Sequence, residues 1–104
     1  MQKILKLTLV TLLGVSVLSS TASADADKGQ RIYAKKLKAS CGMKGSDFAA
    51  RHSQDEWRDI FEAGKLDDEV KSTCNGAEVS EKAIPYLFDF VYEYANDSGN
   101  VPSC

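Results

Sequence analysis

The sequence predicts an all-α domain built from four or five short helices. Apolar residues in the last third of the chain recur at helical spacing, and Ser53-Gln54-Asp55-Glu56 has the pattern of a helix capping box. No segment alternates between apolar and polar residues as a half-buried strand does. These observations favour a small helical bundle.

Residues 1–24 have the design of a secretory signal peptide. Two lysines precede an apolar run over 7–18, and Ala22-Ser23-Ala24 matches an A-x-A cleavage site. The apolar run is shorter than the roughly 20 residues that span a bilayer. We therefore expect a periplasmic protein that begins at Asp25 and has no membrane segment after cleavage.

The remaining residues, 25–104, form one predicted domain of 80 residues with 11 basic and 15 acidic side chains, a net charge of −4. This charge disfavours nucleic acid as a partner and favours a partner with a basic surface. A domain of this size buries only about 60% of its unfolded surface. A cross-link or a cofactor is therefore expected to stabilise it.

The first helix is predicted over 25–37, with Asp27 as its cap. A loop is predicted over 39–45, after which Ser46 is expected to cap a short helical turn through Ala50. One face of the first helix carries residues at helical spacing: Ile32, Tyr33, Lys36 and Leu37.

The capping box at Ser53 starts the next helix, and Gly64 ends it. A weaker, acidic helix is predicted over 66–74, followed by a turn at Asn75-Gly76. This acidic helix has apolar residues at i, i+4 and i+8: Leu66, Val70 and Cys74.

The last helix is predicted to open at Ser80, to accept Pro85 in its first turn and to end near Ala95. It carries two apolar stripes, and the first is Ile84, Leu87, Phe88, Val91, Tyr92 and Ala95. The second is Tyr86, Phe90 and Tyr94. From these patterns we expect five core residues: Trp57, Phe61, Leu87, Phe88 and Val91.

The segment Lys38-Ala39-Ser40-Cys41-Gly42 has the frame of a haem-attachment site. A covalent c-type haem needs Cys-x-x-Cys-His, in which two thiolates form thioethers and the histidine binds the iron. Cys41 stands at the second cysteine, whereas Lys38 and Gly42 replace the first cysteine and the histidine. The preceding segment, Lys28-Gly29-Gln30-Arg31-Ile32-Tyr33, resembles the start of the first helix in small bacterial class I cytochromes c. The chain resembles that family with a degenerate haem-attachment motif.

This resemblance implies a cytochrome c-like arrangement in which the first and last helices cross, with Tyr33 against residues 87–94. It also implies a link with respiratory electron transfer. Class I cytochromes c usually take an axial methionine ligand well downstream of the motif, and this chain has no methionine after Met43. We therefore expect no ordinary covalent haem, although haem binding of another kind remains open.

The side chains that could hold a haem or a metal ion, if one is bound, are those of Cys41, Met43 and His52. His52 is the only imidazole in the chain. Its position just before the Ser53 cap favours plain packing on Trp57 as a staple over a role as a ligand. No catalytic constellation and no dedicated metal site is predicted, so we do not expect an enzyme.

Cys41, Cys74 and Cys104 are disulfide candidates, because an exported protein meets an oxidising compartment. Each of the three possible bridges closes a loop for which chain entropy predicts roughly 3.5 to 4.5 kcal/mol. We favour Cys74 with Cys104, since the nine residues after Ala95 can reach back along the last helix and fix the terminus. That pairing would leave Cys41 free.

Three hypotheses for function follow. In the first, a haem-free or unconventionally ligated relative of the cytochromes acts as a binding or accessory partner of periplasmic redox proteins. In the second, the chain is an electron carrier that holds haem through Cys41 alone or through His52. In the third, it is a disulfide-stapled structural or interaction domain without a redox role. The sequence predicts no oligomeric state.

Overall fold

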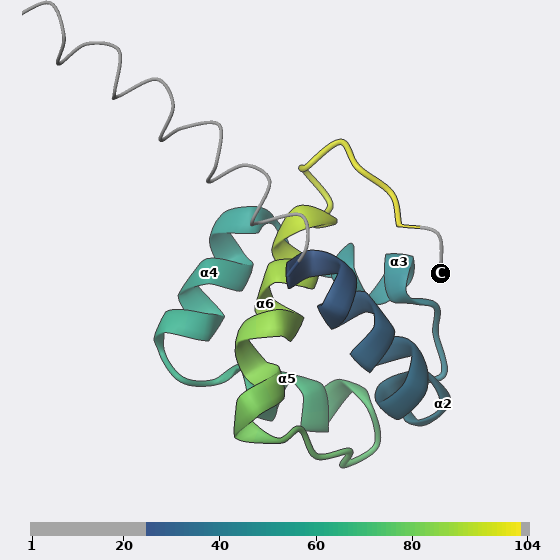
Figure 1. The fold of residues 1–104 in the computed structure, drawn as a ribbon. Helices are drawn as coiled ribbons and strands as arrows, with labels where there is room; N and C mark the ends of the chain where they lie inside the picture. The colour runs from purple at the N-terminus through teal and green to yellow at the C-terminus, as the bar shows by residue number, and fades with distance from the viewer. Residues whose placement is uncertain (1–24, 103–104) are drawn as a thin grey trace, which may run out of the picture.

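The computed structural model describes residues 25–102 (Figure 1). This range folds into helices and contains no strand, which confirms the predicted all-α class. The predicted signal peptide and Cys104 lie outside the described residues. Between residues 25 and 102 no helix is long and apolar enough to cross a membrane.

The first helix runs without interruption over residues 25–41. It consists of α-helix over 25–32, a π-helical turn η1 (Tyr33–Leu37) and α2 (Lys38–Cys41). The predicted end at residue 37 is wrong, because the wider turn of η1 continues the helix to Gly42, whose φ of 68° ends it. The predicted cap at Asp27 is also wrong, since this residue is exposed within a helix that is already formed at residue 25.

The loop after the first helix covers only residues 42–44, which is shorter than predicted. Helix α3 (Gly45–Ala49) begins one residue before Ser46, and Lys44 occupies the N-cap position with no side-chain bond. The predicted Ser46 cap is therefore wrong. Phe48 and Ala49 of this short helix are fully buried, so packing rather than capping stabilises it.

Helix α4 (Gln54–Glu62) confirms the predicted capping box. The Ser53 hydroxyl accepts a hydrogen bond from the Glu56 backbone N–H at 3.2 Å, and the Glu56 carboxylate accepts one from the Ser53 N–H at 2.9 Å. The helix ends before Gly64, which has a φ of 72°. Helix α5 (Leu66–Thr73) follows and buries the three residues that its spacing predicted: Leu66, Val70 and Cys74.

A 3₁₀ turn, η2 (Glu81–Ala83), leads into α6 (Ile84–Glu93), with Pro85 in the first turn as predicted. Residues of both predicted stripes are buried in α6. The helix packs between α4 on one side and the first helix on the other (Figure 1). The buried residues of the two stripes are Leu87, Phe90, Val91 and Ala95.

The core prediction is correct for three residues and wrong for two. Trp57, Leu87 and Val91 are fully buried, as expected. Phe61 and Phe88 are only half-buried, and their rings stack on each other with centroids 4.3 Å apart at the edge of the α4–α6 contact. Aromatic rings fill much of the centre instead: Tyr33, Phe48, Trp57 and Phe90.

The first helix and α6 cross at Gly29. A Cβ atom built at Gly29 would fall on the carbonyl of Tyr86 and within 2.8 Å of the Cβ of Phe90. One turn further on, the rings of Tyr33 and Phe90 lie 5.9 Å apart. This contact confirms the predicted approach of Tyr33 to the last helix.

Replacement of Gly29 by alanine is expected to destabilise the domain by about 1–3 kcal/mol, because the added methyl group must displace backbone atoms of α6. In an exposed helix the same change would stabilise the protein by up to about 1 kcal/mol. The sign of the change in stability therefore distinguishes a close helix crossing at Gly29 from an open position. Urea unfolding followed by circular dichroism measures it. A variant that is more stable than the parent chain would contradict this crossing.

The residues after α6 turn back along the molecule and contact the start of α4. The Asn96 N–H donates to the carbonyl of His52 at 3.1 Å, and the Gln54 N–H donates to the Asp97 carboxylate at 2.9 Å. The Asn100 side chain donates to the Glu93 carbonyl at 3.3 Å. The tail is non-helical, as predicted, and these hydrogen bonds fasten it to two helices.

Candidate functional site at the degenerate haem motif

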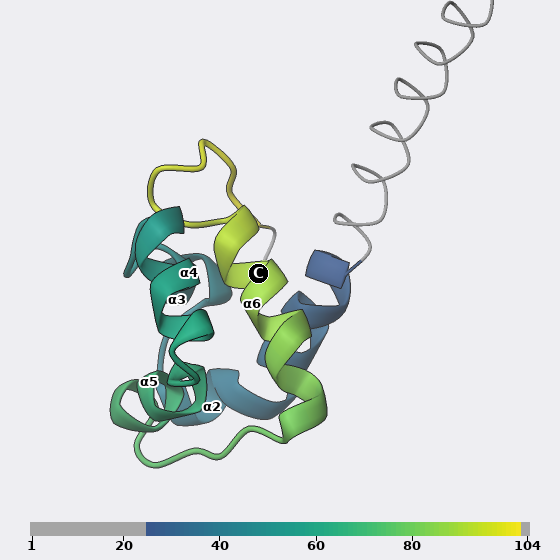
Figure 2. The same ribbon diagram turned by 90° about the vertical axis from the view of Figure 1, so that its left-hand side faces the viewer.

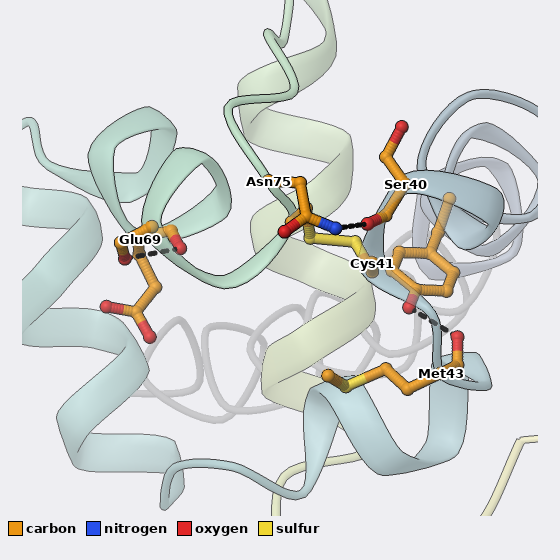
Figure 3. Close-up of a disulfide and its surroundings, with 8 residues drawn as sticks. Ser40, Cys41, Met43, Glu69 and Asn75 are labelled. Carbon is orange, nitrogen blue, oxygen red and sulfur yellow. Dashed lines mark hydrogen bonds between the residues drawn. A yellow bond between two sulfur atoms is a disulfide. The ribbon is translucent and has the colours of Figure 1, made fainter.

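Cys41, the residue predicted to stand at the second cysteine of a haem-attachment motif, forms a disulfide. Cys41, the last residue of α2, is bonded to Cys74 at the end of α5, 33 residues further along the chain (Figure 3). The predicted pairing of Cys74 with Cys104 is therefore wrong. The prediction rested on the reach of the tail, whereas the additional helical turn to residue 41 brings Cys41 against the end of α5.

Two hydrogen bonds hold the backbone beside the disulfide. The Asn75 side chain donates to the Ser40 carbonyl at 2.9 Å, so residues adjacent to both cysteines are joined directly (Figure 3). The Tyr33 hydroxyl donates to the Met43 carbonyl at 2.7 Å and fixes the loop that leaves the first helix. The sequence predicted a turn at Asn75, but it gave no signal for the bond to Ser40, which depends on tertiary packing.

The sulfur of Cys41 is not available for a thioether, because its one free valence is used in the bond to Cys74. Lys38 is exposed at the first cysteine position, and Gly42 has no side chain at the histidine position. The Met43 side chain packs against the core. The residues present at this motif do not fit a covalently attached haem.

His52, the other predicted ligand, is held by carboxylates instead. Its Nε2 lies 2.8 Å from Glu69 Oε2 on α5, and its Nδ1 lies 3.5 Å from Glu56 Oε1 on α4. The imidazole meets the ring of Trp57 edge-on with centroids 4.6 Å apart, which confirms the predicted packing on this residue. His52 therefore joins the segment before α4 to α5, with Glu69 as the partner that sequence reasoning missed.

The carboxylate of Glu56 has a lowered pKa. The main cause is the hydrogen bond from the Ser53 backbone N–H; partial desolvation opposes it, and the nearby His52 adds to it. Within residues 25–102 no three histidine, cysteine, aspartate or glutamate side chains gather into a group that could hold a metal ion. His52 and the carboxylates of Glu56 and Glu69 therefore have a structural role, because they link the start of α4 to α5.

We expect His52 and Glu69 to be coupled by about 1 kcal/mol in a double-mutant cycle with His52→Ala and Glu69→Gln, since both side chains are largely shielded from water. Unfolding free energies from urea titrations measure the coupling. The cycle with Glu56→Gln is the matched control and should give a smaller value, because Glu56 is exposed and further from the ring. Equal coupling in the two cycles would contradict a specific interaction between His52 and Glu69.

Comparison of the chain with family models, with curated proteins and with solved structures finds no match.

Proposed function

We propose that this chain is exported to the periplasm and acts there, without haem, as a binding or accessory partner of electron-transfer proteins. The observation that carries the proposal is the Cys41–Cys74 disulfide, which uses the sulfur at the position where the resembled cytochromes attach their haem. The crossing of the first and last helices at Gly29 and Tyr33 agrees with the arrangement that the resemblance implies. Without haem, a fold of this kind would act by binding a partner rather than by carrying electrons through a haem iron.

The charge of the chain supports a partner with a basic surface. The predicted mature chain has a net charge of −4, and exposed acidic residues lie on α4 and α5. Such a surface attracts a basic protein over about a Debye length, roughly 8–10 Å at ordinary salt. The exposed acidic residues of these two helices are Asp55, Glu56, Asp59, Glu62 and Asp68.

Expression of the full chain with a cytochrome maturation system tests the haem-free part of the proposal. We expect no covalent haem in a pyridine haemochrome assay, because Lys38 cannot form a thioether, Gly42 cannot bind iron and Cys41 is bonded to Cys74. A stoichiometric haem spectrum would instead favour the electron-carrier hypothesis. The Cys41→Ser/Cys74→Ser variant serves as a control for nonspecific haem uptake.

The partner role is tested separately by titration of the purified domain with a basic c-type cytochrome. Binding is expected at low ionic strength and should weaken as salt is added. The Asp59→Lys/Asp68→Lys variant should bind more weakly, and the Lys35→Gln variant should bind at least as well as the parent domain. Absence of binding at low salt would remove the partner role and leave a stapled structural domain.

A further inference from the structure

A concave surface with an apolar floor lies away from the disulfide, between the first helix and the segment that enters α6. It is a groove of about 410 Å³, within the range of about 300–1,000 Å³ that small-molecule sites occupy. We name it the lysine groove after the three lysines on its rim: Lys28, Lys36 and Lys82. Its apolar lining consists of Ile32, Leu37, Val79, Ala83 and Tyr86.

The two walls of the lysine groove are fixed at both ends. Near one end the first helix touches the backbone of Tyr86 at Gly29, so the two walls cannot separate there. Beyond the other end the first helix is bonded through Cys41 to Cys74, just before the segment that forms the opposite wall. Figure 2 shows this segment, between α5 and α6, passing the end of α2 before α6 begins. The groove is thus held open by the fold and does not need a ligand to form.

The rim of the lysine groove is cationic, in contrast to the acidic chain around it. Its lining includes three lysines and one carboxylate, that of Glu78. In the part of the chain that the structure describes, none of the three ammonium groups forms an ion pair within 4.0 Å. The Lys28 ammonium lies 4.3 Å from the centroid of the Tyr86 ring, so Lys36 and Lys82 are the cations with no such partner.

We propose that the lysine groove binds a single-chain fatty carboxylate. The alkyl chain would lie on the apolar floor between Ile32 and Val79, and the carboxylate would meet the ammonium groups of Lys36 and Lys82. Burial of the chain supplies most of the free energy, and the lysines supply the preference for an anion. This proposal is independent of the partner role, which rests on the acidic helices and the disulfide.

Isothermal titration of the purified domain with sodium decanoate, below its micelle concentration, tests the proposal. We expect binding of one decanoate per chain. Octanoate, which is two methylenes shorter, should bind up to about fifteenfold more weakly, because each buried methylene accounts for about a fourfold change. Butanoate, with the same head group, and decyltrimethylammonium, with the same chain, should both bind at least tenfold more weakly. No decanoate binding, or equal binding of the cationic amphiphile, would overturn the proposal.

Two lysines that are neighbours in sequence give a matched pair of variants. Lys36→Glu should weaken decanoate binding about fivefold, whereas Lys35→Glu makes the same charge change on an exposed residue outside the groove and should have little effect. Ala83→Phe, which fills the floor, should abolish binding. Circular dichroism checks that each variant is folded.

Light scattering over a range of protein concentrations distinguishes a competing occupant of the groove. If the domain forms dimers that Lys36→Glu disrupts, a second copy occupies the groove and the fatty-carboxylate proposal is wrong. Equal weakening of decanoate binding by Lys35→Glu and Lys36→Glu would likewise overturn it, because the effect would then be one of overall charge.

Discussion

Replacement of Trp57 by alanine is expected to cost about 3–5 kcal/mol of unfolding free energy, enough to leave a domain of this size largely unfolded. Trp57 is fully buried, and its ring lies 5.6 Å from Phe48 and 4.6 Å from His52. Its indole N–H also donates to the Ala49 carbonyl at 2.8 Å. The change removes a large part of the core together with the partner of a buried carbonyl.

Urea or thermal unfolding followed by circular dichroism measures the effect of Trp57→Ala. Trp57→Phe is the graded control: it keeps an aromatic ring beside Phe48 but leaves the Ala49 carbonyl without its donor, so a loss of about 1–3 kcal/mol is expected. Asp59→Ala, on an exposed site of the same helix, should change stability by less than about 0.5 kcal/mol. A loss below about 1 kcal/mol for Trp57→Ala would mean that this ring is not central to the core.

Removal of the disulfide through Cys41→Ala/Cys74→Ala is expected to cost about 2–5 kcal/mol. Chain entropy alone gives about 4 kcal/mol for a loop of this separation, 33 residues. The bridge joins the end of the first helix to the end of α5, two elements that are far apart in the sequence. The variant should therefore unfold at a much lower urea concentration than the parent domain.

Two measurements check this prediction. Peptide mapping without reduction should recover Cys41 linked to Cys74. Cys104→Ser is the matched control and should leave stability unchanged, since Cys41 and Cys74 are bonded to each other. Recovery of a fragment in which Cys104 is linked to either of the other cysteines would contradict the assigned bridge.

Local signals in the sequence predicted the fold well where the structure depends on neighbouring residues. The Ser53 box and the turn at Asn75-Gly76 are examples, because their hydrogen bonds or backbone angles arise within a few residues. The spacing of Leu66, Val70 and Cys74 also predicted correctly which residues of α5 are buried.

The predictions failed where distant segments decide the outcome. The π-helical turn at residues 33–37 cannot be inferred from helical spacing, and without it the first helix was expected to end too early. That error moved Cys41 into a loop and favoured the wrong disulfide. Phe88 was assigned to the core by its stripe, but α6 faces two neighbours and buries Phe90 instead.

The sequence predicted which residues belong to the candidate site but not which residues they bond to. Cys41 and His52 were both identified as candidate site residues. Their partners in the structure are Cys74 and Glu69, at the end of α5 and within it, and the resemblance to the cytochromes did not predict that α5 contacts them. From the sequence alone, a carboxylate on an acidic helix that has a specific partner cannot be told from one that is simply exposed to solvent. Only the packing of α5 against the segment before α4 distinguishes Glu69 from its neighbours.

The hydrogen bonds between the tail and the start of α4 affect the order in which the parts of the domain can fold. The Gln54 N–H is one of the donors at the start of α4 that have no acceptor within the helix itself. It donates instead to the carboxylate of Asp97, 43 residues later in the chain. The contact between α4 and α6 likewise joins residues far apart in the chain. A chain that emerges from its amino end can form the first helix early, but α4 gains these contacts only after the last residues have arrived. Folding of this domain should therefore finish as a late, cooperative step.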